Sequence, residues 1–218
     1  MKTRRTVAVY VDGFALYKAL LQRQYPQYKW LDLEALARRL FPHRDVVQVK
    51  YFTAPLKPMT NDPGVGQRQQ VYWRALATTN VDIITGTFSF VKQWLPVHPE
   101  VLDPDGRVVT ALVKRPEEKG TDVALASHLI FDAVDGVADS FAIVTNDSDL
   151  VPPLTMLAKR GHSLALISVA GSAYNKAFDG IGLDTVRQIR RGTLHSSQFS
   201  PVLRDADGRT IRKPPTWT

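Results

Sequence analysis

The chain has 218 residues, 44% of them hydrophobic, which is enough for one domain with a sizeable core and a small appendage. It contains no cysteine, which excludes disulfide bonds, thiolate catalysis and cysteine-ligated zinc. The net charge of +7 favours an anionic partner such as nucleic acid, although a basic surface that only aids solubility explains it equally well.

The expected location is the cytoplasm. The first residues are basic and precede an apolar run, as in a signal peptide, but the run is short and ends at Asp12. No apolar stretch approaches the roughly 20 residues that a membrane helix requires. We therefore expect a cytoplasmic protein with no membrane partner.

The elements that the sequence predicts alternate between strands and helices. In chain order we expect a buried strand at 7–11, helices at 14–24 and 31–41, a strand at 46–53, a helix at 65–78, an extended segment at 81–90, a hairpin turn at 101–109, a charged loop at 114–120, a helix at 121–134, a strand at 141–144, a helix at 150–160 and a strand at 163–168. This alternation predicts an α/β fold with a doubly wound, mostly parallel sheet and short β-hairpin appendages.

Four aspartates follow strands or begin helices. Asp12 and Asp147 come directly after buried strands, Asp149 follows two residues later, and Thr121 or Asp122 is expected to cap a helix. Ligands of doubly wound sheets bind beyond the carboxyl ends of the strands, so the four carboxylates could converge there. Oxygen ligands suit Mg²⁺ or Mn²⁺, and such a site favours phosphodiester hydrolysis. The alternative is that each aspartate only caps a helix, a role that suits Asp149 before L-V-P-P.

Three motifs carry a resemblance to a known family. V-Y-V-D-G-F-A-L-Y at 9–17, K-G-T-D-V-A-L-A at 119–126 and V-T-N-D-S-D-L-V-P-P-L at 144–154 resemble the NYN domain proteins, a branch of the PIN-like nuclease group. Together they span most of residues 6–170. The resemblance implies a PIN-like fold and a metal-dependent ribonuclease.

The resemblance also implies roles for individual residues. Asp12, Asp122 and Asp147 would form the acidic core, with Asp149 as an additional ligand or water-positioning group, and Lys119 matches the lysine of the family's K-G-x-D motif. Two positions depart from the family pattern: Ala15 stands where the family usually has asparagine, and His128 where it often has a further aspartate. These departures favour an alternative, an RNA-binding or regulatory module with little or no turnover.

The expected partner is single-stranded or loop RNA, and a homo-oligomer is possible. Single strands are held by phosphate contacts and base stacking, so we expect RNA to contact basic groups that lie near aromatic ones. The candidates are Arg68 and Arg74 on the helix at 65–78, together with Lys114 and Arg115 beside the acids. Lys119 is expected to point toward the acids, or else to be a solvated loop lysine.

The last residues are expected to form an appendage rather than a free arm. We divide the chain into a nuclease-like domain at 1–190 and an appendage at 191–218 that docks on it. The D-A-D-G-R segment at 205–209 predicts a short hairpin. Large apolar groups at intervals, among them Trp217, predict that the appendage packs against the domain, because a solvated chain has few of them.

Overall fold

The centre of the molecule is a six-stranded parallel sheet, seen in a computed structural model that describes residues 4–169 and 174–217. The strand order is β3-β2-β1-β6-β7-β8, and every neighbouring pair is parallel. The strands are β1 (Thr6–Asp12), β2 (Asp45–Thr53), β3 (Val81–Thr85), β6 (Phe141–Thr145), β7 (Leu164–Ser168) and β8 (Thr185–Gln188). The predicted α/β fold with a doubly wound parallel sheet is confirmed.

The direction of winding reverses between β1 and β6. From β1 the chain proceeds outward through β2 and β3, then returns to pair β6 with the other side of β1 and continues through β7 to β8. The carboxyl ends of β1 and β6 therefore lie side by side at the topological switch point, where ligands of such sheets bind. Asp12 is the last residue of β1 and Thr145 is the last residue of β6.

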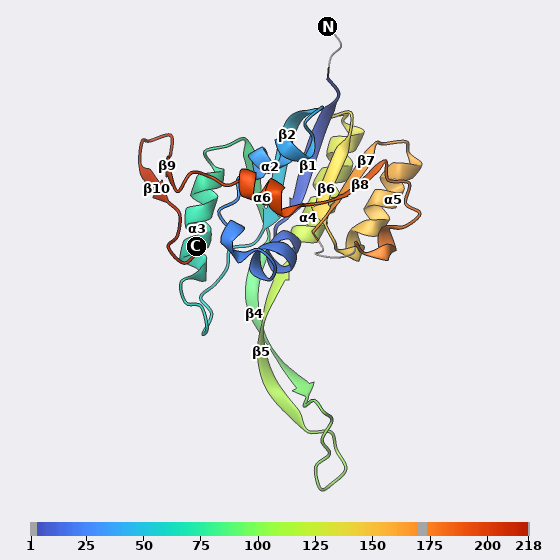
Figure 1. Ribbon diagram of the computed structural model, residues 1–218. Coiled ribbons are helices and arrows are strands. Elements are labelled where there is room, and N and C mark those ends of the chain that lie inside the picture. The colour runs from blue at the N-terminus through green and yellow to red at the C-terminus, as the bar shows by residue number, and fades with distance from the viewer. Residues whose placement is uncertain (1–3, 170–173, 218) are drawn as a thin grey trace.

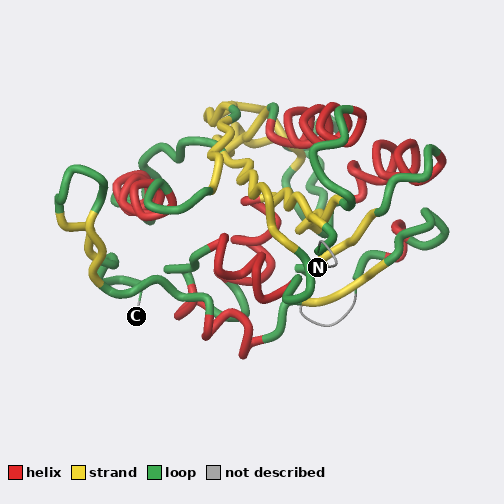
Figure 2. The backbone as a smooth tube through the Cα atoms, turned by 90° about the horizontal axis from the view of Figure 1, so that it is seen from above, coloured by secondary structure: helices red, strands yellow, loops and turns green. Residues whose placement is uncertain are grey.

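Helices cover both faces of the sheet (Figure 2). The helical elements are α1 (Gly13–Ala15), the π-helix η1 (Leu16–Gln22), η2 (Pro26–Tyr28), α2 (Leu33–Leu40), α3 (Val65–Leu76), α4 (Thr121–Val134), η3 (Ser148–Leu150), α5 (Val151–Lys159), η4 (Lys176–Phe178) and α6 (Arg191–Ser196). One core packs α4 and α5 on one face of the sheet, and the other packs η1, α2, α3 and α6 on the opposite face. Alternate residues of β1 enter the two cores, as the two-residue period of a strand requires.

The helix predicted at 14–24 is a π-helix over most of its length. Its wider turn is seen in the hydrogen bond that the N–H of Tyr25 donates over 2.8 Å to the carbonyl of Leu20, five residues back. Leu16, Leu20 and Leu21 are all buried in the core below it. The spacing of the apolar residues therefore predicted the buried face of this helix correctly, but it did not predict the π-helical hydrogen bonds.

A buried ion pair joins α4 to the middle of the sheet. The Lys50 ammonium lies 2.5 Å from the Asp132 carboxylate, which also accepts a 2.6 Å hydrogen bond from the hydroxyl of Tyr10. The same ammonium lies 3.2 Å from Nδ1 of His128. Buried charges are tolerated only when they are paired and hydrogen-bonded, as here. His128 therefore belongs to this network rather than to the acids at the end of the sheet.

A long two-stranded ribbon, here called the arm, projects from the body (Figure 1). It comprises β4 (Thr87–Pro96), β5 (Thr110–Lys119) and the turn between them, which includes the Leu102–Val108 bridge of the predicted hairpin. The charged loop predicted at 114–120 was wrong, because cross-strand pairing with β4 holds residues 114–119 extended. The helix cap predicted at Thr121 or Asp122 was also wrong: Gly120, with φ +92°, is the N-cap of α4.

The C-terminal segment packs on the second core, as predicted. After α6 it forms the predicted hairpin from β9 (Val202–Arg204) and β10 (Thr210–Arg212). Trp217 is 8% exposed, and its ring centroid lies 6.1 Å from that of Trp30 and 5.8 Å from that of Tyr72. The boundary between a domain at 1–190 and an appendage at 191–218 stays a prediction.

None of the helices in the described ranges is both long and apolar enough to cross a membrane.

Candidate metal centre

Asp12 is held in a fixed orientation at the end of β1. Its Oδ1 accepts a hydrogen bond from the backbone N–H of Ala15 at 2.9 Å, so that it caps α1, and its Oδ2 accepts one from the hydroxyl of Thr145 at 2.8 Å. Burial raises the pKa of this carboxyl, and the charge of Asp147 acts in the same direction, although the two hydrogen bonds oppose the shift. The ionised form is therefore disfavoured unless a cation is nearby.

Thr145 links the two strand ends, and the sequence analysis did not identify it. Its buried hydroxyl donates to Asp12 and accepts a 3.1 Å hydrogen bond from the backbone N–H of Asp147. Asp147 in turn caps η3, because its Oδ1 accepts from the N–H of Asp149 at 3.0 Å. The sequence signal that could have identified Thr145 is its position at the end of the strand, two residues before Asp147.

Asp122 reaches the same point from the first turn of α4. Its pKa is raised to about 6, chiefly by burial and then by the charges of Asp12 and Asp147. In water the carboxyl of aspartate titrates near pH 4. The part of the shift that repulsion between carboxylates adds shows that Asp122 lies within electrostatic reach of the other two.

The three carboxylates can share one cation. Asp12, Asp122 and Asp147 each offer an oxygen, and these oxygens all lie within 4.8 Å of one another. Asp149 is exposed and is not part of this group, so three of the four predicted carboxylates converge. The N-cap of η3 is Asp147 and that of α5 is Leu150. The alternative prediction, that Asp149 caps a helix, was therefore wrong.

The acids face a cleft of about 240 Å³. Besides the three aspartates it is lined by Phe14, Ala15, Lys18 and Glu118. Glu118 also accepts a 3.1 Å hydrogen bond from the N–H of Thr121, which fixes the start of α4 against the arm. Lys18 was missed by the sequence analysis, although it follows Phe14 by one helical turn and lies 5.4 Å from that ring.

Lys119 is not among the residues that line the cleft. Its ammonium lies 3.4 Å from the Glu117 carboxylate, and its side chain is 67% exposed. Lys18, which lines the cleft, is placed to contact an anion there, a position that was predicted for Lys119.

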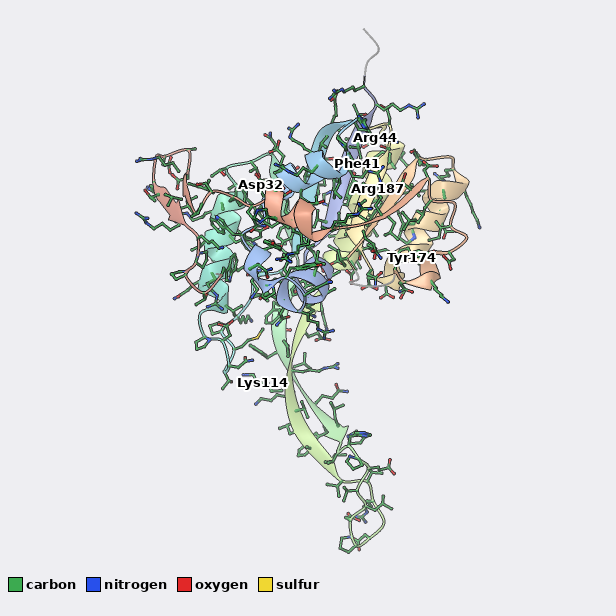
Figure 3. The ribbon with its side chains drawn as sticks, viewed as in Figure 1. Asp32, Phe41, Arg44, Lys114, Tyr174 and Arg187 are labelled. Atoms are coloured by element: carbon green, nitrogen blue, oxygen red, sulfur yellow. The ribbon has the colours of Figure 1, made fainter. Side chains whose placement is uncertain are left out.

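The four predicted RNA-binding cations do not form one surface. Figure 3 shows Lys114 out on the arm rather than beside the acids. Arg115 follows it in β5, so the two side chains point to opposite faces of the arm. Arg74 forms a 2.9 Å ion pair with Asp205 of the C-terminal hairpin. Arg68 pairs with Asp62 at the edge of a second cavity.

That second cavity is aromatic and lies next to the cleft, with Phe14 lining both. Its walls include Tyr17, Tyr51, Tyr72 and Trp217, with the cations Lys29 and Arg68. Burial, followed by the charge of Arg68, lowers the pKa of Lys29, whose ammonium lies 5.6 Å from the Tyr17 ring. The cavity has a volume of about 70 Å³.

Comparison with known proteins gives a matching family, a relative in sequence and a solved structure with a similar fold. The NYN domain model matches residues 6–179. HspA of Pseudomonas putida, named 6-hydroxy-3-succinoylpyridine 3-monooxygenase, is 30% identical over 185 residues, which cover 74% of this chain and 57% of that protein. The chain thus spans little more than half of that relative's length. A protein of unknown function from Vibrio parahaemolyticus shares the fold, with a TM-score of 0.54 and 15% identity over 91% of this chain and 99% of that one.

The family match covers all three motifs that contribute the converging acids, at 9–17, 119–126 and 144–154. It also accords with the parallel sheet and with the position of the acids at its switch point. The chain belongs to the NYN domain family.

Proposed function

We propose that this protein is a metal-dependent ribonuclease that hydrolyses phosphodiester bonds in single-stranded or loop RNA in the cytoplasm. The observation that carries the proposal is the convergence of Asp12, Asp122 and Asp147 on one point. None of the three forms an ion pair with a lysine or arginine in the described part of the chain. Three carboxylates that repel one another and form no ion pair are a suitable ligand set for Mg²⁺ or Mn²⁺.

The chain's own residues suit this chemistry. The hydrogen bonds from Ala15 and Thr145 hold the Asp12 carboxylate in one orientation, so it does not have to reorient when a cation binds. A bound divalent cation would neutralise charge on the phosphoryl group and activate water. Lys18 in the cleft would hold a phosphate. We propose that Asp149, whose charge acts on Asp122, orients water, and that Lys119 adds positive charge near the site.

Incubation of the full chain with labelled single-stranded RNA tests the proposal. The reaction is run with Mg²⁺, with Mn²⁺ and with a chelator. Cleavage that is lost on chelation supports a metal-dependent ribonuclease. RNA that is bound but not cleaved identifies the alternative, an NYN module that binds RNA without turnover. If RNA is neither bound nor cleaved, the aspartates serve only as helix caps and structural groups.

The affinity for Mn²⁺ should rise with pH and level off above about pH 6. The pKa of Asp122 is raised to about 6, so below that pH a cation must displace a proton to gain this ligand. The stability of the metal-free protein should change in the opposite sense. A carboxyl with a raised pKa favours the folded state when protonated, and this contribution is lost as the pH rises from about 4 to about 6.

Calorimetric titration of Mn²⁺ at about pH 5, 6 and 7 measures the first effect, and thermal melting of the chelated protein measures the second. Asp122→Asn should reduce both pH dependences. An affinity that does not change over this range would mean that Asp122 is not a ligand.

A second candidate function is supported by the aromatic cavity. The relative HspA is named for the oxygenation of a pyridine that carries an acidic side chain. The cavity combines four aromatic walls with Lys29 and Arg68, which suits a small aromatic acid. Binding of 6-hydroxy-3-succinoylpyridine, measured by calorimetry in the full chain and weakened at least about tenfold by Lys29→Ala, would favour this candidate over RNA cleavage.

A further inference from the structure

Among the described residues, the two strands of the arm pair only with each other. Figure 1 shows the ribbon leaving the body near η1 and extending well beyond it. A two-stranded hairpin alone is at best marginally stable in water, so a ribbon of this length indicates a surface that something covers. The strand register shows what each of its faces offers.

One face of the arm alternates aromatic and basic groups. Residues directly opposite each other in an antiparallel pair share a face, and every second residue along a strand returns to it. Phe90, Lys92 and Trp94 of β4 therefore share a face with Lys114 and Leu112 of β5. We call these five residues the ladder face. Trp94 is 64% exposed, and the Lys114 ammonium lies 4.5 Å from the centre of the Phe90 ring.

Two like charges are paired across the ribbon on this face. Lys92 is directly opposite Lys114, an arrangement that destabilises an antiparallel pair. No carboxylate of the described chain forms an ion pair with either lysine. An anion between the two ammonium groups would remove the repulsion.

The ladder face leads to the acidic cleft. Four residues toward the body from Lys114, on the same face of β5, is Glu118, which lines the cleft beside Asp122. Four residues of an extended strand span about 14 Å. A chain held on the ladder face can thus continue into the cleft, and Figure 3 shows Lys114 on the part of the arm nearer the body.

We infer that the ladder face binds single-stranded RNA that enters the cleft, with a phosphate between Lys92 and Lys114 and a base stacked on Trp94. This inference rests on the proposed action of the protein on RNA and adds where the strand is held. Phosphate contacts and stacking on aromatic rings are the means by which proteins hold single strands without reading their sequence. A second copy of the chain is the weaker occupant, because two ladder faces placed together would bring four lysines against one another.

Binding of a labelled single-stranded RNA of about 20 nucleotides to the full chain tests the inference. The titration is done in chelator, so that no cleavage occurs, at several salt concentrations. The variants are Trp94→Ala, the double variant Lys92→Ala/Lys114→Ala, and Arg115→Ala, which removes a charge from the opposite face of the arm. The control for net charge is Arg4→Ala/Arg209→Ala, since both arginines are exposed and lie on the body.

The lysine double variant should weaken binding at least about tenfold and reduce the slope of log affinity against log salt by about 0.7, the value for one phosphate contact to a single strand. Trp94→Ala should weaken binding roughly tenfold with the slope unchanged. Arg115→Ala should have a smaller effect than either. If the control variant loses as much affinity as the lysine variant, the binding follows net charge and the inference is overturned. It is also overturned if the ladder variants change the molecular mass in solution from dimer to monomer, which would assign the face to a second copy.

Cleavage of a labelled dinucleotide separates this inference from the proposed function. A dinucleotide in the cleft is too short to reach Lys114, so the arm variants should cleave it at the rate of the unaltered protein. RNA binding that depends on the ladder face, without cleavage of any substrate, would refute the ribonuclease and keep the inference. Metal-dependent cleavage together with unchanged RNA binding in the ladder variants would support the ribonuclease and refute the inference.

Discussion

Asp12→Asn should abolish metal-dependent cleavage and raise the melting temperature of the metal-free protein. The substitution removes one of three converging charges but keeps the volume of the side chain and an oxygen that can accept from the N–H of Ala15. We expect a loss in kcat of at least about 100-fold, because the cation would lose its most buried ligand. The carboxyl of Asp12 has a raised pKa, so its ionised form opposes folding at neutral pH.

The gain in stability distinguishes a functional acid from a structural one. A gain of about 1 kcal/mol corresponds to about 2–4 °C in a protein of this size. Asp135→Asn, at the other end of α4 and exposed, is the matched control and should change neither property. Kinetics on labelled RNA and thermal melting with and without Mn²⁺ measure the two effects. Lower stability together with retained cleavage would show that Asp12 is only a helix cap.

Deleting residues 196–218 should lower the thermal stability of the whole domain more than any single surface change. The segment contributes main-chain contacts as well as side chains: the carbonyl of Ser197 accepts from the N–H of Asp32 at 2.8 Å, and the N–H of Phe199 donates to the carbonyl of Trp30 at 3.0 Å. Trp217 closes the aromatic cluster of the second core. Removing these groups exposes that core to water.

Trp217→Ala tests the same idea without removing backbone. Replacing a buried tryptophan with alanine costs about 3–5 kcal/mol, which corresponds to about 10 °C here. Val202→Ala is the matched control, because Val202 lies in the same segment and is 46% exposed. Differential scanning calorimetry compares the variants. Equal melting temperatures for Trp217→Ala and Val202→Ala would mean that the segment is not part of the cooperative unit.

Much of the fold could be predicted because its signals are local. Buried strands such as β6 and β7 are short apolar runs, and an amphipathic helix such as α2 repeats its apolar residues at helical spacing. The packing of the C-terminal segment on the domain could be predicted from its large apolar side chains, since leaving Trp217 in water costs free energy. Both kinds of signal lie within a few residues of the element that they specify.

The arm shows where local signals fail. Residues 110–119 include five charged residues and a proline, which is typical of a loop. They form a strand because β4 pairs with them, and that pairing is a property of two segments, which the charges of one segment do not reveal. The opposed lysines of the ladder face became visible only with this register.

For the candidate site, the positions of the acids along the chain could be predicted: Asp12 and Asp147 follow buried strands, because a buried run must stop where a charge begins, and Asp122 lies at the start of a helix. Which of these acids meet depends on the three-dimensional arrangement of the elements. The strand order places β1 beside β6, and α4 packs on the sheet with its first turn near their carboxyl ends. Asp122 therefore joins Asp12 and Asp147, the hydroxyl of Thr145 connects those two, and Asp149 is left exposed. Lys18, and not the predicted Lys119, lines the cleft. The direction of a side chain depends on the strand or helix geometry around it, and spacing in the sequence does not reveal that direction.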